Sequence, residues 1–204
     1  MSPHSSTNCN SDNLPGKHRI VDGWLADAQR IPSPNFNVRP QNTPISMLVI
    51  HNISLPPGEF GGGYIDALFC NCLEPHAHDF FAQIAQLEVS AHLLIDRQGA
   101  VTQYVNFADR AWHAGQSCYA GVDNCNDYSI GIELEGTDSC PYTDQQYARL
   151  QQVTWLLMNT YSHLNGERIV GHCDIAPGRK TDPGPSFDWA RYRLSLEKLT
   201  GGSQ

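Results

Sequence analysis

Several short stretches in the middle of the chain are continuously apolar or alternate between apolar and polar residues, which predicts β-strands. Residues 128–135 alternate most clearly, with Ile130, Ile132 and Leu134 separated by small or acidic residues. An apolar run over residues 46–51 ends at His51 and predicts a buried strand. The predicted strands span residues 46–51, 89–95, 100–105, 128–135 and 168–172, and the turn sequence at 96–99 joins two of them in a hairpin.

A second pattern, with apolar residues three or four positions apart, predicts two longer helices in the C-terminal third. The first begins after Thr143, because Thr143 and Gln146 form a capping-box sequence. Its apolar positions are Tyr147, Leu150, Val153, Leu157 and Tyr161, and those of the last helix are Trp189, Tyr192, Leu196 and Leu199. A short helix is expected within residues 64–72. Strands alternate with helices and one hairpin is present, so we expect an α/β fold: a single domain with a central mixed β-sheet flanked by helices.

The chain of 204 residues is long enough for one well-packed domain, which we place at residues 23–200 after a polar N-terminal arm at 1–22. A net charge of −8 argues against a nucleic-acid partner, because phosphate binding needs a basic surface. The sequence shows neither an apolar run of membrane-spanning length nor the apolar core of a signal peptide. We therefore expect a cytoplasmic protein without membrane association, and nothing in the sequence implies an obligate protein partner.

The cysteines are expected to be free thiols, because their number is odd and the cytoplasm is reducing. They are Cys9, Cys70, Cys72, Cys118, Cys125, Cys140 and Cys173. Cys70 and Cys72 lack the two-residue spacer that is typical of structural zinc sites. Cys173 is interpreted as a buried thiol and not as a ligand beside His172, because neighbours in an extended chain point to opposite sides.

The segment 171–184 gathers three chemically active side chains between prolines and glycines. Proline is incompatible with a regular helix interior, so we expect a loop, and loops on a rigid scaffold often carry functional groups. His172, Lys180 and Asp182 together suggest a metal site with a fixed positive charge beside it.

His51 and His172 each end a predicted strand, and active sites gather at strand ends in such sheets. With Asp182 they would supply the three nitrogen and oxygen ligands that a catalytic zinc usually takes, with the fourth position left for water. Spacing alone does not select these three. The competing candidates are the pair His76 and His78, and the single residues His92 and His113.

Several longer motifs resemble one known family, the cytosolic 1,6-anhydro-N-acetylmuramyl-L-alanine amidases or AmpD proteins. The motifs are VIHNISLPPGEFG at 49–61, VSAH at 89–92, RAWHAG at 110–115, CNDYSIGIELEGTD at 125–138, GHCDIAP at 171–177 and RKTDPG at 179–184. They follow one another in the order found in that family, and the resemblance runs from about residue 23 to about residue 193. So many long motifs in the same order make the resemblance far more specific than a short pattern.

The resemblance implies an N-acetylmuramoyl-L-alanine amidase-like fold, related to phage-lysozyme amidases and peptidoglycan recognition proteins. It implies one Zn²⁺ per chain, held by His51, His172 and Asp182. The implied reaction is hydrolysis of the amide between the lactyl group of anhydro-N-acetylmuramic acid and L-alanine. The implied substrates are anhydro-muramyl peptides imported during cell-wall recycling, whose removal also reduces β-lactamase induction.

Glu133 is implied as the catalytic carboxylate and Lys180 as the cation that stabilises the tetrahedral state. Strand parity by itself leaves Glu133 and Glu135 equivalent, and the resemblance selects Glu133. We expect further substrate contacts from Asn52, Trp112 and His113. The family often has basic residues just before the 89–92 and 125–127 motifs, where this chain has Glu88 and Asn124, so saccharide contacts do not carry over to these two positions.

Two other functions fit the same resemblance. One is a non-catalytic peptidoglycan-recognition module, although such relatives typically lose a zinc ligand and this chain keeps all three candidates. The other is an exported amidase that acts on intact murein, which would require export.

Overall fold

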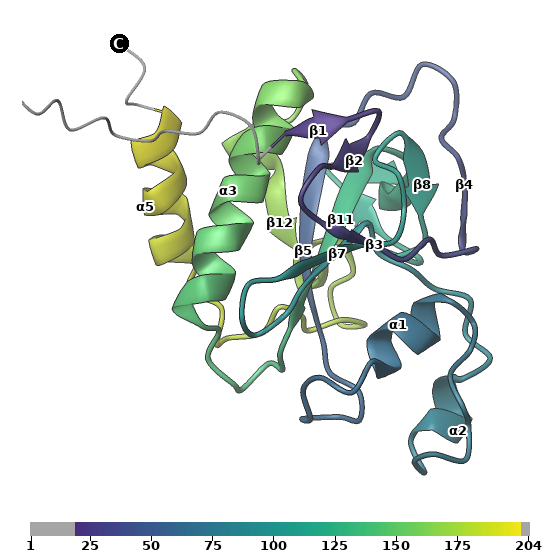
Figure 1. The fold of residues 1–204 in the computed structure, drawn as a ribbon. Coiled ribbons are helices and arrows are strands. Elements are labelled where there is room, and N and C mark those ends of the chain that lie inside the picture. The colour runs from purple at the N-terminus through teal and green to yellow at the C-terminus, as the bar shows by residue number, and fades with distance from the viewer. Residues whose placement is uncertain (1–18, 201–204) are drawn as a thin grey trace, which may run out of the picture.

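In this computed structural model, which describes residues 19–200, a six-stranded mixed sheet forms the centre of the chain (Figure 1). The strand order is β12-β5-β11-β6-β7-β3. The strands span Gln29–Arg30 (β3), Met47–Ile53 (β5), Leu93–Ile95 (β6), Val101–Gln103 (β7), Ser129–Glu135 (β11) and Ile169–Gly171 (β12). Strands β12, β5, β11 and β6 are parallel to one another, β6 and β7 form the predicted antiparallel hairpin, and β3 pairs in parallel with β7. The predicted mixed sheet is therefore confirmed.

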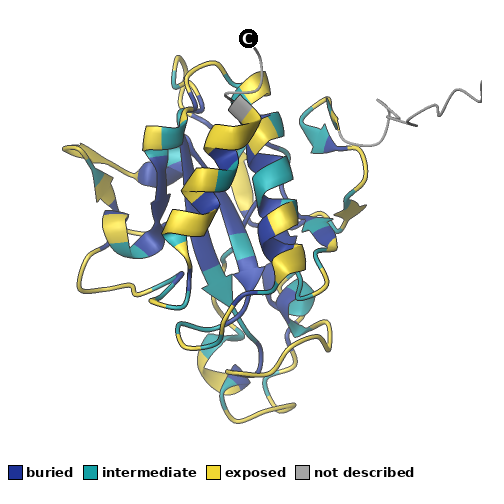
Figure 2. Cartoon of the chain, turned by 90° about the vertical axis from the view of Figure 1, so that its left-hand side faces the viewer, coloured by how far each residue is buried: buried dark blue, intermediate teal, exposed yellow. Residues whose placement is uncertain are grey.

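The two faces of the sheet have different roles, because successive side chains of a strand point to opposite sides. On one face, Leu48 and Ile50 of β5 and Ile130 and Ile132 of β11 belong to the main hydrophobic core. Two helices cover this face (Figures 1 and 2): α3, Asp144–Thr160, and α5, Trp189–Thr200. On the opposite face, Met47 and Val49 of β5 belong to a smaller hydrophobic cluster, and the polar residues His51 and Glu133 lie beside it, where the candidate site is found.

Helix α3 begins where its sequence predicts. The Gln146 backbone N–H donates to Thr143 Oγ1 at 3.1 Å, and the Thr143 N–H donates to Gln146 Oε1 at 3.1 Å. This capping box satisfies two backbone donors of the helix start. The predicted apolar stripe is buried from Tyr147 to Leu157.

Smaller elements surround this core. The helical ones are α1 (Tyr64–Phe69), α2 (Phe81–Ile84), α4 (His172–Ile175) and the 3₁₀ turns η1 (Cys125–Asp127) and η2 (Gly166–Arg168). The remaining strands form two-stranded ribbons: β1 (Ile20–Val21) with β2 (Trp24–Leu25), β4 (Phe36–Val38) with β8 (Asp109–Ala111), and β9 (Cys118–Tyr119) with β10 (Val122–Asp123). Most of the predicted arm, residues 1–18, lies outside the described residues, and its last residues form β1.

Some local predictions need correction. The strand predicted at 89–95 begins only at Leu93, and His51 lies within β5 and not at its end. His172 follows its strand as the first residue of α4, so the segment predicted as a loop begins with one helical turn that ends before Pro177. Leu199, expected on the packed face of the last helix, is 41% exposed. Within residues 19–200, none of the helices combines the length and apolar character that crossing a bilayer requires.

Candidate active site

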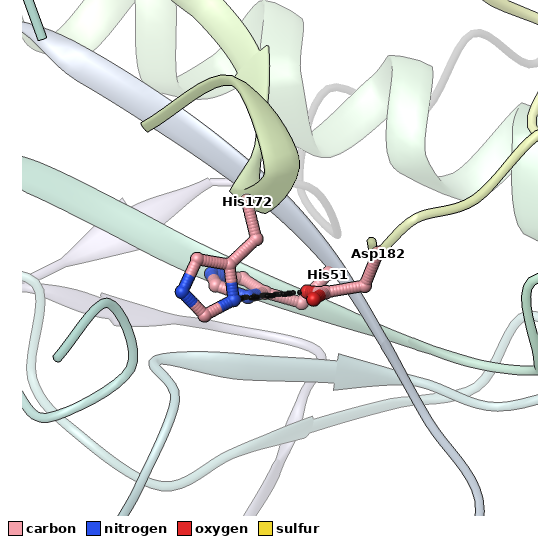
Figure 3. A group of neighbouring side chains, drawn as sticks. All are labelled: His51, His172 and Asp182. Atoms are coloured by element: carbon pink, nitrogen blue, oxygen red, sulfur yellow. Dashed lines mark hydrogen bonds and ion pairs between the residues drawn. The ribbon is translucent and has the colours of Figure 1, made fainter. Parts of the chain in front are cut away.

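Three side chains that are distant in sequence converge on the face of the sheet opposite α3 and α5. His51 comes from β5, His172 from the start of α4, and Asp182 from the segment after α4. Their donor atoms point toward one another (Figure 3): His51 Nδ1 lies 2.9 Å from His172 Nδ1, and each Nδ1 lies 3.0 Å from Asp182 Oδ2. We call these residues the His–His–Asp cluster. The convergence predicted from the sequence is thus present in the structure.

The positions of the ring protons indicate that the cluster is suited to hold a cation. His172 Nε2 lies 3.0 Å from the Ala114 carbonyl oxygen, which can only accept, so Nε2 carries the ring proton and Nδ1 presents a lone pair. This lone pair faces a carboxylate oxygen and a second imidazole nitrogen. A cation among the three atoms removes the repulsion between lone pairs. Tetrahedral zinc bonds of about 2.0–2.2 Å place ligand atoms about 3.3 Å apart, close to the observed separations.

Burial and neighbouring charges shift the pKa values of the cluster residues. Burial lowers the pKa of His51 to about 4, against the opposing influence of the nearby Asp182 carboxylate, so the imidazole is neutral at pH 7 as metal binding requires. For Asp182, burial acts to raise the pKa, but its close contacts with the His172 and His51 rings outweigh it and hold the pKa below its usual range. Two neutral imidazoles and one carboxylate give a donor set with a formal charge of −1. Among residues 19–200, these three are the residues that meet the geometry of a metal site.

Glu133 lies beside the cluster on the same face of the sheet. In the parallel pairing of β11 with β5 it stands opposite His51. Its Oε2 atom is buried and has no hydrogen-bond partner among the described residues. Burial raises the pKa of Glu133 well above its usual value, the charge of Asp182 adds to this effect, and Lys180 opposes it. A carboxylate with few hydrogen bonds and a raised pKa is a stronger base than an ordinary glutamate.

Glu135, the alternative on the same face, is engaged differently. Its Oε1 accepts a hydrogen bond from the Gly61 N–H at 2.5 Å, and its Oε2 accepts one from the Arg97 N–H at 3.2 Å. Both carboxylate oxygens therefore hold loop backbone, which favours Glu133 as the free carboxylate.

Lys180 is exposed, and its charge acts on both His51 and Glu133. Burial is the largest influence on the pKa of both Glu133 and His51, and the positive charge of Lys180 lowers both as a lesser contribution. Its backbone N–H donates to the Ala176 carbonyl at 3.0 Å, which ties the turn after α4 and fixes the start of its side chain.

The three predicted substrate contacts lie in different surroundings. Asn52, next to His51 in β5, donates from Nδ2 to Asp138 Oδ1 at 2.9 Å. Trp112 is half-buried and donates from Nε1 to Asn37 Oδ1 at 2.9 Å.

His113 lies behind the cluster, with Nδ1 at 2.9 Å from His51 Nε2 and Nε2 at 3.1 Å from Ser129 Oγ. Both of its ring nitrogens face protein groups, so His113 is a direct neighbour of His51.

Of the competing candidates for metal ligands, His76, His78 and His92 lie outside the His–His–Asp cluster. His76 and His78 are exposed, and His78 Nδ1 accepts the Phe80 N–H at 3.1 Å. His92 is fully buried, accepts the Gly131 N–H at Nδ1 and contacts the Asp109 carbonyl oxygen with Nε2. The six described cysteines are free, and Cys173, predicted to be buried, is half-buried.

Two residues that support the site were not singled out from the sequence. Asn126 Oδ1 accepts the backbone N–H groups of both His113 and Ala114, at 3.1 and 2.8 Å. The buried guanidinium of Arg39 donates to the carbonyl oxygens of Asn126, Asp127 and Ser129. Each of these contacts joins residues that are distant in sequence, so no local sequence pattern predicts it.

Comparison with known proteins identifies the class to which this fold and site belong. The family described as N-acetylmuramoyl-L-alanine amidase matches residues 41–185, a range that includes the His–His–Asp cluster and Glu133. The chain therefore belongs to the N-acetylmuramoyl-L-alanine amidase family, which makes it an amide hydrolase. Within this family it is 58% identical, over 181 residues, to the 1,6-anhydro-N-acetylmuramyl-L-alanine amidase AmpD of Escherichia coli (strain K12). The match covers 89% of this chain and 98% of that protein, and it confirms the resemblance inferred from the motifs.

Solved structures agree. The crystal structure of a selenomethionine AmpD derivative matches with a TM-score of 0.85 at 58% identity, covering 87% of this chain and 98% of that one. The amidase AmiD from E. coli, in complex with the substrate anhydro-N-acetylmuramic acid-L-Ala-D-gamma-Glu-L-Lys, matches with a TM-score of 0.56 at 30% identity, covering 77% of this chain and 60% of that one. The predicted fold class is confirmed.

Proposed function

We propose that this chain is a zinc-dependent amidase that hydrolyses the amide between 1,6-anhydro-N-acetylmuramic acid and L-alanine in recycled muropeptides. The observation that carries the proposal is the His–His–Asp cluster, in which three buried or half-buried donor atoms lie 2.9–3.0 Å apart. The activity of the 58% identical E. coli relative and the anhydro-muramyl peptide in the AmiD complex support the choice of substrate.

His51, His172 and Asp182 would hold the zinc ion. In a three-ligand site of this kind zinc supplies Lewis acidity, which brings the pKa of water to about 7. Backbone contacts hold the three proposed ligands rigidly. His51 lies inside a parallel strand pair, and the Cys173 N–H donates to the Asp182 carbonyl oxygen at 3.0 Å, which joins the two ends of the 172–182 segment.

Glu133 would act as the general base and then as the general acid. Its carboxylate takes a proton from the water that attacks the amide carbon, and it delivers that proton to the departing alanine nitrogen. The buried environment that raises its pKa strengthens it as a base and lets it hold the proton between the two steps.

Lys180 would stabilise the negative charge that develops on the amide oxygen in the tetrahedral state. One such donor typically contributes about 100- to 1000-fold in rate. Asn52, next to His51 in the sequence, and Trp112, next to His113, would contact the substrate. An aromatic face suits the apolar face of a sugar ring.

We place the enzyme in the cytoplasm, where it would act on imported muropeptides and reduce β-lactamase induction in bacteria with that circuit. The free thiols of the described residues agree with a reducing compartment. Cell fractionation tests this, because a periplasmic protein would favour an amidase acting on intact murein.

The decisive experiment is mass spectrometry of products formed from an anhydro-muramyl tripeptide, with intact murein as a parallel substrate. We expect anhydro-N-acetylmuramic acid and free tripeptide, loss of the reaction in a chelator, and recovery with added Zn²⁺. A protein that binds the muropeptide without cleaving it would support the recognition-module alternative. Full turnover after verified removal of metal would overturn the proposal.

A further inference from the structure

Both histidines of the cluster are held from behind by the same two-residue segment. The Nε2 atom of His51 lies 2.9 Å from His113 Nδ1, and that of His172 lies 3.0 Å from the carbonyl oxygen of Ala114. The two ligand rings come from separate elements, β5 and α4, yet consecutive residues contact the outer nitrogen of each. We call residues 113–114 the backing segment.

The backing segment is itself fixed on several sides. Asn126 is 5% exposed, and its Oδ1 accepts both N–H groups of the segment. Arg179 Nη2 donates to the Ala114 carbonyl at 2.7 Å. The ring of His113 packs against Gly131, where an added Cβ would lie 2.4 Å from His113 Cγ. Only glycine at that position leaves room for the ring.

The hydrogen bonds determine which nitrogen of each ligand faces the cluster. Ala114 offers a carbonyl acceptor, which holds the proton of His172 on Nε2. For His51 the acceptor is His113 Nδ1, provided that the proton of His113 is on Nε2. Ser129 Oγ, 3.1 Å from His113 Nε2, can accept that proton, because a hydroxyl offers lone pairs as well as a donor.

We propose that His113 is a positioning residue for the metal site: with Ser129 behind it and Asn126 fixing its backbone, it holds His51 as the Nε2–H tautomer, so that Nδ1 faces the metal. A neutral imidazole in this place differs from the carboxylate, carbonyl or water that usually supports a metal-ligating histidine. The inference rests on the proposed zinc site and replaces the substrate contact expected for His113 from the sequence.

The test compares His113→Leu, which removes the acceptor, with His113→Asn, whose side-chain oxygen can take the place of Nδ1. Zn²⁺ affinity is measured by competition with a chromophoric chelator. Loss of an outer hydrogen-bond partner typically weakens metal binding about 10- to 100-fold, which we expect for His113→Leu, with most of the affinity restored in His113→Asn.

A second readout reports the tautomer directly. Long-range ¹H–¹⁵N correlation spectra of the zinc-free protein distinguish protonated from unprotonated ring nitrogens. In the wild type we expect His51 to be protonated at Nε2, and in His113→Leu we expect a mixture of tautomers. A purely structural role for His113 would not shift this tautomer balance.

Ser129→Ala extends the test with a smaller change that leaves His113 in place. Removing the acceptor of the His113 Nε2–H favours the opposite His113 tautomer, so we expect weaker Zn²⁺ binding in the same direction. Ser46→Ala, just before β5 and beside Arg168, is the matched control and keeps the wild-type affinity.

The outcomes separate this inference from the proposed function. A wild-type protein that binds no zinc would overturn the metal site itself. Wild-type zinc affinity and an unchanged His51 tautomer in His113→Leu would overturn the positioning role while leaving the amidase proposal standing. If His113→Leu does not fold, the same two measurements on Ser129→Ala decide, and an unchanged affinity and tautomer there reject the role.

Discussion

Glu133 and His51 stand opposite each other on the adjacent parallel strands β11 and β5, and both side chains point to the same face of the sheet. Neighbouring strands lie about 4.8 Å apart, so the proposed base and the proposed metal ligand project side by side. Their separation is set by backbone pairing in the centre of the sheet. This rigid frame holds the two groups in place before substrate arrives, which is how preorganised sites lower a barrier.

Replacing Glu133 by Gln removes the proposed base and keeps the shape of the side chain. We expect kcat on an anhydro-muramyl peptide to fall by about 100- to 10,000-fold, the usual contribution of general acid–base catalysis. Zinc content, measured by mass spectrometry of metals, should stay at the wild-type level because Glu133 is outside the His–His–Asp cluster. A Glu133→Gln protein with full activity would disprove the base assignment.

Glu135→Gln is the matched control, because Glu135 has the same parity on β11 but binds the Gly61 and Arg97 backbone. We expect it to lower stability while kcat stays within a few-fold of the wild type. A larger loss of kcat in Glu135→Gln than in Glu133→Gln would exchange the two roles.

Replacing Asp182 by Ala removes the one negatively charged member of the cluster. We expect Zn²⁺ affinity to fall by more than the roughly 100-fold that loss of an outer partner can cause, because a direct ligand is lost. The measurement is chelator competition, with metal content of the purified protein as a second readout. Asp174→Ala serves as control: Asp174 caps the Gly171 N–H at 2.7 Å and should leave zinc binding intact. Equal affinities in the two variants would exclude Asp182 as a ligand.

Lys180→Met removes the proposed oxyanion charge and preserves the length of the side chain. Since such a donor acts on the transition state, kcat should fall about 100- to 1000-fold with little change in KM. Lys198→Met, an exposed lysine on α5, should retain wild-type kinetics. An effect on KM alone would reassign Lys180 to ground-state binding.

Much of the fold could be predicted because the relevant signals are local. The capping box of Thr143 with Gln146 and the alternation at Ile130, Ile132 and Leu134 belong to contiguous segments that form α3 and β11. Residues 89–92 show where a local pattern fails. There Ser90 Oγ donates to the Asn35 carbonyl at 2.7 Å, and such polar tertiary contacts replace a regular strand ladder.

The candidate site likewise has parts that the sequence predicts and parts that it does not. His51, His172 and Asp182 stand in motifs that the sequence displays, and the structure brings them together. Their supports are a carbonyl oxygen of Ala114 and an amide oxygen of Asn126, which meet the cluster or its backing segment only after folding. Every residue has a backbone carbonyl, so the residue type does not indicate which carbonyl accepts a tertiary hydrogen bond. Contacts of this kind cannot be predicted from the sequence alone.

Acid should destabilise the protein through its buried neutral histidines, and His92 allows the effect to be isolated. Burial, with the nearby charge of Arg39 adding to it, holds the pKa of His92 well below its ordinary 6.5, while its hydrogen bond with the Asp109 carbonyl acts in the opposite direction. Below pH 6.5 the unfolded chain therefore takes up a proton at this residue that the folded protein does not. The stabilisation is complete above pH 6.5 and is lost as the pH falls, by about 1.4 kcal/mol per pH unit for one such histidine.

Urea unfolding of the zinc-free protein between pH 7 and pH 5 measures this dependence. His92→Asn, whose side-chain oxygen can still accept the Gly131 N–H, should lower the slope of unfolding free energy against pH by up to that amount. His163→Asn, at an exposed position, is the matched control and should keep the wild-type slope. If His92→Asn and the wild type lose stability equally on acidification, His92 is protonated in the folded protein as readily as in the unfolded chain, and Arg39 and burial do not hold it neutral.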